Sequence, residues 1–197
     1  MNNRTIILVC FIVLIAGAMN WLLDQNVTEP PARELSREDP DLFMVNANIT
    51  HFDNSGTVQH KLRASRFTHF PVNDITTLED PDLDLFSDNG PWNIASRKGR
   101  LFPKSTHEQD LVELWGHVVA VRESGDGNFT NIQTESLFIY PEHDYAETEE
   151  KVYIDDNSGR TTAAGMEAWL ETGQFRFFSR PHERVNTVLE PGQLPAR

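Results

Sequence analysis

The chain has 197 residues and a formal net charge of −13, from 30 acidic and 17 basic side chains. Its first 25 residues contain one Arg and one Asp, so the whole acidic excess belongs to the remainder. That remainder is long enough for one domain with a proper core. Its charge disfavours binding to nucleic acid or to anionic lipid headgroups. The single cysteine, Cys10, excludes a disulfide framework or a cysteine-based metal site elsewhere.

Residues 6–23 form a continuous apolar block in which Asn20 is the only polar side chain. As a helix, such a block would reach about 27 Å, close to the ~30 Å hydrocarbon thickness of a bilayer. Arg4 precedes it and Asp24 follows it, which predicts residues 1–5 in the cytoplasm and the rest of the chain outside. A cleaved signal peptide is the alternative, because residues 16–18 resemble a cleavage box. Since the apolar run continues to Leu23, we expect a retained single-span transmembrane helix.

Residues 24–40 hold three prolines and seven charged side chains, and this composition predicts a tether. The folded domain is then expected over residues 41–186, followed by a flexible tail at 187–197. Within the domain, apolar residues alternate with polar ones, as at 82–85, 112–118 and 152–154. A period of two indicates half-buried antiparallel strands.

Turn sequences rich in Gly, Asn and Asp separate these strands at 53–56, 88–90, 124–127 and 155–159. They recur at an interval of about 34 residues, which suggests a stack of similar β-units. Only residues 162–171 have the composition of a short helix, and Gly165 and Gly173 disfavour it. The pattern therefore predicts an all-β domain, with a first strand near 43–50 and a last strand near 175–185.

No motif for catalysis, a cofactor or a metal stands out. The seven histidines lack the usual metal-ligand spacings, and His51, His60 and His69 are nine apart, as adjacent strand positions would be. The carboxylate pair Asp82 and Asp84 fits a solvent-facing side of a strand better than an acid–base pair. We expect no enzyme and no cofactor. Two basic clusters, at 61–66 and 97–104, fit either a solvated face or a contact for ligand phosphate groups.

Several short sequence motifs together resemble those of the LptC family, whose members are the inner-membrane component of the lipopolysaccharide export bridge of Gram-negative bacteria. They are Asp39-Pro40 at the domain start, the turn at 52–56 followed by Lys-Leu-Arg-Ala at 61–64, Leu-Trp-Gly-His-Val at 114–118, and Ile-Gln-Thr-Glu at 132–135. The stretch 150–153 lacks the glycine that members often carry there. Pro181 also predicts that the final strand bends or ends at that point.

The resemblance implies an open, twisted β-jellyroll that holds the acyl chains of lipopolysaccharide in its apolar interior. It implies a single-pass protein of the inner membrane with a periplasmic domain, which receives lipopolysaccharide from an ABC transporter. The transmembrane helix and first strand would meet the permease subunits and the ATPase complex, and the last strand would meet a soluble bridge protein. The expected lipid contacts are Ala47, Leu62, Leu78, Leu114, Val118, Ile139 and Phe177. The expected partner contacts are Phe43, Val45, Phe175 and Phe177.

The alternative from another class is a membrane-anchored carbohydrate-binding or glycan-hydrolysing β-sandwich. A third is a structural tether that binds proteins and no lipid. Tryptophans gathered on one exposed face, from Trp92, Trp115 and Trp169, would favour the carbohydrate alternative. Apolar rows that point inward would favour lipid.

Overall fold

The computed structural model describes residues 39–189 except for positions 54, 88–89, 105–108 and 124–126. All of these residues belong to one compact unit, Arg37–Arg197. The predicted transmembrane helix at 6–23 and all but the last two residues of the predicted tether lie outside the described residues. In the part that is described, no helix is long and apolar enough to cross a membrane.

The described residues form fourteen strands and one short 3₁₀ helix, and every strand pairing among them is antiparallel. The prediction of an all-β domain is confirmed. The elements are β1 (Leu42–Phe52), β2 (Val58–Phe70), β3 (Ile75–Glu79), β4 (Asp82–Leu85), β5 (Trp92–Ala95), β6 (Lys98–Phe102), β7 (Leu111–Glu123), β8 (Phe129–Tyr140), η1 (Pro141–His143), β9 (Tyr145–Thr148), β10 (Val152–Asp156), β11 (Gly159–Ala163), β12 (Gly165–Trp169), β13 (Gln174–Phe178) and β14 (Asn186–Leu189).

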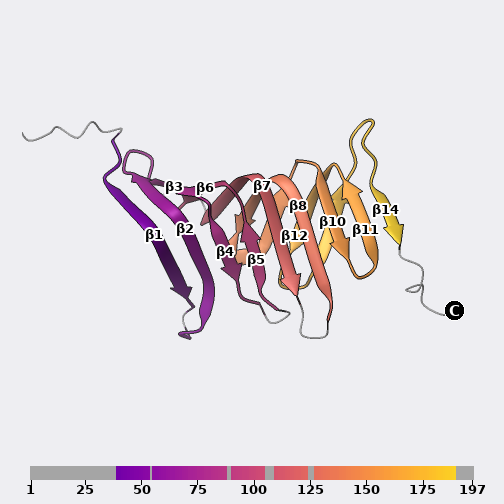
Figure 1. Ribbon diagram of the computed structural model, residues 1–197, viewed down its shortest axis with the longest axis horizontal. Helices are drawn as coiled ribbons and strands as arrows, with labels where there is room; N and C mark the ends of the chain where they lie inside the picture. The colour runs from indigo at the N-terminus through magenta and orange to yellow at the C-terminus, as the bar shows by residue number, and fades with distance from the viewer. Residues whose placement is uncertain (1–38, 54, 88–89, 105–108, 124–126, 190–197) are drawn as a thin grey trace, which may run out of the picture. The chain divides into compact units, whose positions relative to one another are not determined.

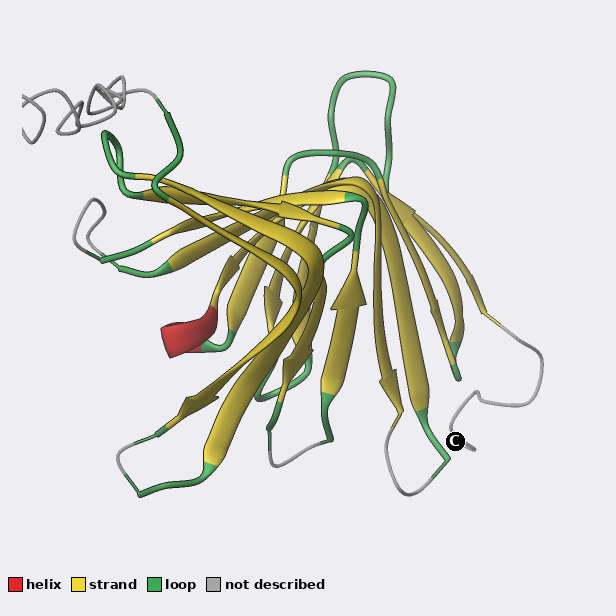
Figure 2. Ribbon diagram, turned by 60° about the vertical axis from the view of Figure 1, so that its left-hand side comes forward, coloured by secondary structure: helices red, strands yellow, loops and turns green. Residues whose placement is uncertain are grey.

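Four long strands, β1, β2, β7 and β8, bend and contribute to two layers that diverge from a common fold line (Figure 2). One end of β2 pairs with β4 and its other end pairs with β3; β7 is shared in the same way by β5 and β6, and β8 by β10 and β9. The first layer therefore contains β4, β5, β10, β11 and β14, and the second contains β3, β6, β9, β12 and β13. This arrangement agrees with the predicted open, twisted β-jellyroll.

Strands β1 and β7 cross the fold line through local irregularities rather than as regular strands. In β1, Met44 and Ala47 both pack against the core, three positions apart, and Asn46 between them has a φ of 50°. In β7, Gly116 and His117 have φ values of 79° and 66°, and the register with β8 shifts there. The irregularity in β7 is a bulge, which bends a strand and increases its twist. Strand β1 keeps its register with β2 across Asn46, and there the positive φ changes which side chains point inward. Both irregularities let one strand serve two layers that face each other.

The core lies between the layers and consists of the inward side chains of both. Leu114 of β7, Ile139 of β8 and Ile94 of β5 are completely buried. Burying such a side chain contributes about 1.5–3 kcal/mol relative to leaving it exposed. The hydrophobic alternation of the sequence is therefore explained by a single continuous interior.

In the C-terminal part, residues 162–171 contribute to β11 and β12, as the all-β prediction requires, and Ala164, Met166 and Ala168 are buried. The position of the last strand differs from its prediction. The last strand is not at 175–185: β13 ends at Phe178, and a loop through Pro181 leads to β14. The expected flexible tail therefore begins too early, because residues 187–189 belong to β14. The expectation that the strand ends near Pro181 is confirmed.

Strands β1 and β14 lie at opposite ends of the unit (Figure 1). Among the strands of the described residues, β1 pairs only with β2, and β14 pairs only with β11. Each therefore leaves one edge of backbone N–H and C=O groups without a partner strand in this part of the chain.

Candidate functional site

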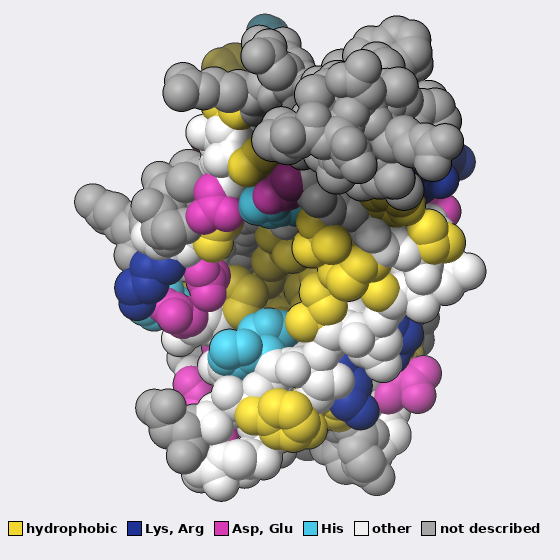
Figure 3. Space-filling view, turned by 90° about the vertical axis from the view of Figure 1, so that its left-hand side faces the viewer, with side chains coloured by type: hydrophobic (Ala, Val, Ile, Leu, Met, Phe, Trp, Pro, Cys, Tyr) yellow, Lys and Arg dark blue, Asp and Glu magenta, His cyan; other side chains and the backbone are white. Residues whose placement is uncertain are grey.

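A cavity of about 310 Å³ lies between the two layers at the β1 end of the unit. Figure 3 looks onto that end and shows hydrophobic side chains gathered in a hollow. The walls come from strands far apart in the sequence, because the layers face each other. The apolar lining residues are Ile49, Leu62, Leu83, Leu101, Phe102, Pro103, Leu111, Val112 and Pro141. A smaller hollow lined by Leu42, Met44 and Phe67 shares Ile49 and Leu101 with this cavity.

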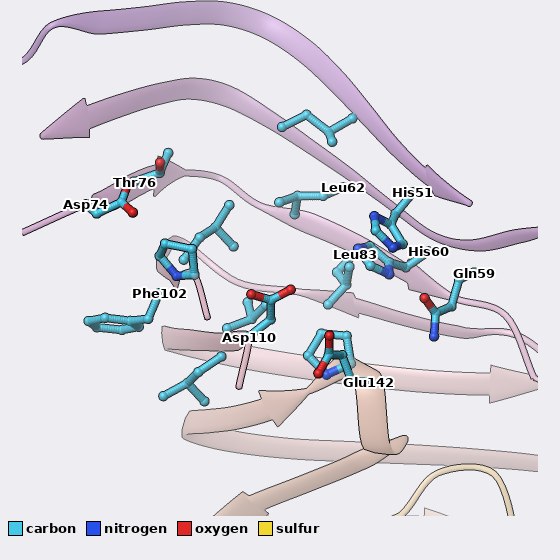
Figure 4. A pocket seen from close by; sticks show the side chains of 16 residues that line it. His51, Gln59, His60, Leu62, Asp74, Thr76, Leu83, Phe102, Asp110 and Glu142 are labelled. Atoms are coloured by element: carbon cyan, nitrogen blue, oxygen red, sulfur yellow. The ribbon is translucent and has the colours of Figure 1, made fainter. Parts of the chain in front are cut away.

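Polar side chains border the cavity on both layers (Figure 4). His51 of β1 and His60 of β2 are directly opposed in register, and their rings stack at 4.7 Å between centroids and 7° between planes. Burial lowers the pKa of His60, the neighbouring His51 lowers it further, and Asp110 opposes both effects. Burial thus favours the neutral form of His60. The cavity has mainly apolar walls, with His51, His60 and the carboxylates of Asp74, Asp110 and Glu142 among its polar lining residues, and its apolar part suits an apolar chain.

The acidic residues on the outer face are engaged with basic ones. Arg63 donates to Asp84 at 2.8 Å and to Asp82 at 3.0 Å, and the Asn93 amide donates to both carboxylates. Burial opposes ionisation of Asp84, but the hydrogen bonds from Asn93 and Arg63 outweigh it and lower its pKa. The interpretation of Asp82 and Asp84 as a solvent-facing pair is confirmed, since both are half-exposed and hydrogen-bonded on the side of β4 away from Leu83.

The basic clusters also lie on the outer face and are largely paired. Arg66 and Lys98 lie 3.9 Å and 3.7 Å from carboxylate oxygens of Glu79, and Arg100 lies 3.7 Å from Glu113. None of the basic residues of the two clusters lines the cavity. The structure therefore favours a solvated, paired face over a phosphate contact for these clusters.

The start of β1 is fastened to the turn between β2 and β3 by one histidine. His69 hydrogen-bonds Asp41 through Nδ1 at 2.6 Å and Asp74 through Nε2 at 3.0 Å. These two carboxylates raise the pKa of His69 through the hydrogen bonds and their charge. The start of β1 is thus held by the hydrogen bond between His69 and Asp41, which strengthens when His69 is protonated.

All seven predicted lipid contacts face the interior. Leu62, Leu78, Leu114, Val118 and Ile139 are buried, and Ala47 and Phe177 are half-buried against the core. Only Leu62 of this set lines the cavity. The sequence therefore identified residues of the buried core, but it did not identify most of the residues that line the cavity.

Residues of that wall include Ile49, Leu101 and Phe102. The alternation from Ala47 through Ile49 to His51 could have indicated the β1 side of the wall. Leu101 and Phe102 carried no comparable signal, because they are adjacent in the sequence and lie where β6 ends.

The predicted partner contacts fall in two different settings. Phe43 and Val45 are exposed on β1, at 68% and 56%. Phe175 and Phe177 lie on β13 instead, stacked on each other with centroids 6.2 Å apart and packed against the core. The strand at the far end of the unit is β14, with Val188 and Leu189 exposed.

The three tryptophans do not gather on one exposed face. Trp115 and Trp169 are half-buried on the outer side of the second layer, next to the inward Leu114 and Ala168. Trp92 instead points inward and is completely buried. Trp115 lies beneath the Arg100 guanidinium at 4.8 Å, and Trp169 lies beneath that of Arg176 at 5.6 Å. They belong to strands separated by β8 and β9 in the second layer. The condition set for the carbohydrate alternative is not met.

Comparison with known proteins decides the family. Residues 7–188 match the family described as "Lipopolysaccharide-assembly, LptC-related". The chain belongs to this family. The resemblance seen in the sequence is therefore confirmed, and this LptC-related chain has a role in lipopolysaccharide assembly.

The fold of this LptC-related chain is also similar to a solved structure: "Crystal structure of LptH, the LptA homologous periplasmic component of the conserved lipopolysaccharide transport device from Pseudomonas aeruginosa". The TM-score is 0.50 at 10% sequence identity, and the match covers 80% of this chain and 99% of LptH. At this identity the similarity concerns the fold alone. No curated protein matched the chain.

Proposed function

We propose that this chain is a non-enzymatic component of the lipopolysaccharide transport bridge, and that it holds lipopolysaccharide acyl chains between its two β-layers. The observation that carries the proposal is the apolar cavity at the β1 end. Its volume lies at the lower end of the range of roughly 300–1,000 Å³ that is usual for ligand pockets. The seven inward residues predicted as lipid contacts continue the same interior.

The distribution of charge supports an interior binding mode. The chain carries −13, and its acidic outer surface does not attract a phosphorylated glycolipid. Apolar burial supplies about 0.8 kcal/mol per methylene group removed from water. A chain of about ten methylenes would thus gain roughly 8 kcal/mol before the costs of ordering it.

Among the strands with a free edge in the described residues, β1 and β14 lie at opposite ends, and they would give the proposed bridge its direction. We assign β1, with exposed Phe43 and Val45, to pairing with the permease subunits of the inner-membrane transporter. We assign β14 to pairing with the soluble periplasmic bridge protein, because it lies at the opposite end from β1 (Figure 1). Strand addition to such edges forms main-chain hydrogen bonds between proteins. Phe177 remains a proposed lipid contact, since it faces the interior.

The proposed location follows from the sequence of residues 1–40. Residues 6–23 would anchor the chain in the inner membrane, with residues 1–5 in the cytoplasm and the β-domain in the periplasm. The anchor would also place the chain beside the ATPase complex.

The test compares two substitutions on neighbouring positions of β1. Ile49 lines the cavity and is 39% exposed, so Ile49→Asp places a charge on the wall without disturbing the deep core. Asn48 is exposed and lies outside the cavity lining, so Asn48→Asp adds the same charge elsewhere. Losing about 1.5–3 kcal/mol of apolar contact weakens binding roughly 10- to 100-fold.

The expected result is therefore a weakening of that size in lipopolysaccharide binding to full-length Ile49→Asp in nanodiscs, and a change within about twofold for Asn48→Asp. Equal affinities of both variants and the unmodified chain would contradict the proposal.

A further inference from the structure

The two layers also touch each other beyond the cavity, through a contact that the strand pairing does not require. The indole Nε1 of Trp92 in β5 donates to the carbonyl oxygen of Leu170 at 3.3 Å, across 78 positions of sequence. Leu170 directly follows β12, so the first layer is joined here to the turn between β12 and β13 in the second. The turn is fixed in its own layer, because the Leu170 N–H donates to the carbonyl of Asp144.

Aromatic and cationic contacts surround this hydrogen bond. The ring of Phe175 in β13 meets Trp92 edge to face, with centroids 6.4 Å apart, and Phe177 stacks on Phe175. The Arg122 guanidinium lies over the Trp92 ring, 4.9 Å from its centroid. Arg122 also approaches the turn between β12 and β13, because a Cβ built on Gly173 would lie 3.1 Å from its guanidinium nitrogens. Trp92 is consequently completely buried, enclosed by groups from both layers.

The hydrogen bond from Trp92 to Leu170 lies on the strand next to the cavity. The cavity is lined by residues between Ile49 and Glu142, with Leu83 of β4 among them. Strand β5 is the next strand after β4 in the first layer, and it carries Trp92. Beyond it toward β14 the inward side chains Val152, Ile154 and Ala163 are buried. In the first layer, the strand next to the cavity therefore carries Trp92, and Phe175 reaches Trp92 from β13, the last strand of the second layer.

We propose that Trp92 and Phe175 form a gate across the groove, and that an acyl chain passes toward β14 only when the β12–β13 hairpin moves away from β5. This inference rests on the proposed function, since it concerns the passage of the same lipid. The hairpin is suited to move, because β13 pairs only with β12 among the described strands. Its specific contacts with the first layer are one hydrogen bond, one aromatic contact and the packing of Arg122, and the buried side chains of Met166 and Leu170 add apolar contact in the shared core.

The test is hydrogen exchange on the full-length chain in nanodiscs, with and without lipopolysaccharide. Segments with few buried attachments open locally, and exchange reports that opening. We expect residues 170–178 to exchange at least about fivefold faster with lipopolysaccharide present, while residues 49–62 exchange more slowly. If 49–62 become protected and 170–178 do not loosen, the gate is wrong and the lipid-binding function stands. If 49–62 gain no protection, the proposed function fails and the gate with it.

A variant tests the gate without relying on lipid. Phe175→Ala removes the aromatic contact, so residues 170–178 should exchange at least about fivefold faster in the absence of lipopolysaccharide. Phe70→Ala is the matched control, because Phe70 is also half-buried but lies at the end of β2. Loosening of 170–178 to the same extent in both variants, or in neither, would overturn the role of Phe175.

Discussion

Gly159 provides the sharpest test of β14 as the C-terminal edge. A Cβ built on Gly159 would lie 2.0 Å from the carbonyl oxygen of Val188 and 3.0 Å from the Cα of Leu189, and both obstacles are backbone. Gly159 also has a φ of 141°, a region that costs other residues about 1–3 kcal/mol. An alanine therefore cannot occupy this position while β14 stays in register with β11.

Release of β14 from β11 would relieve this clash. The β11–β14 ladder joins four residue pairs, and each hydrogen bond contributes about 0.5–1.5 kcal/mol net. All four residues of β14 are exposed, so little apolar burial opposes release. We expect Gly159→Ala to detach β14 while the core strands β7 and β8 remain folded.

The assay measures amide exchange at residues 186–189 and co-purification of the soluble bridge protein. Protection at 186–189 should be lost and co-purification should fall together. The matched control is Gly127→Ala, because Gly127 has a φ of 85° but no atom within 4 Å of its built Cβ. It imposes backbone strain without a clash and should leave 186–189 protected. Retained protection at 186–189 in Gly159→Ala would show that β14 stays paired with β11 despite the added methyl group, contrary to this prediction.

Further predictions concern the core and the fastening of β1. Leu114→Ala should lower the free energy of unfolding by about 2–5 kcal/mol in urea titrations, because its side chain is completely buried. Val72→Ala, at a site 62% exposed, should change it by less than about 0.5 kcal/mol, and similar losses in both would be contrary to the assigned core. Asp41 and Asp74 raise the pKa of His69, so its stabilising effect is full below the ordinary value of 6.5 and is lost as pH rises through the raised value. Amide exchange at residues 41–45 should accordingly accelerate over that pH range, and His69→Gln should remove the pH dependence; an unchanged dependence in His69→Gln would assign it to another group.

The sequence predicted the strands well because their alternation reflects burial on one face. Residues such as Leu62, Leu78 and Ile139 entered the core as expected. The faces of β1 were harder to predict, because the irregularity at Asn46 shifts the inward positions from Met44 to Ala47 and Ile49. Positive φ values are enriched at Asn, Asp and His, and all six non-glycine residues with a positive φ in the described part of the chain are of these types. Most described residues of these types have ordinary angles, however, so Asn46 alone does not mark the irregularity.

The C-terminal part shows what a local pattern cannot provide. The apolar run at 175–178 belongs to β13, an edge strand of the second layer, yet its Phe175 packs against Trp92 from the opposite layer. That contact depends on how two layers fold over each other, and no spacing within either segment encodes it. Strand β14 is short and fully exposed, so its sequence lacks the alternation that identified the other strands.

The central claim, that acyl chains lie between the layers at the β1 end, is tested most directly by photocrosslinking in cells. A photoreactive residue at Ile49 points into the cavity, and one at Asn48 on the same strand lies outside the cavity lining. We expect a lipopolysaccharide adduct from position 49 and none from position 48. Adducts from both positions, or from position 48 alone, or from neither, would contradict the central claim.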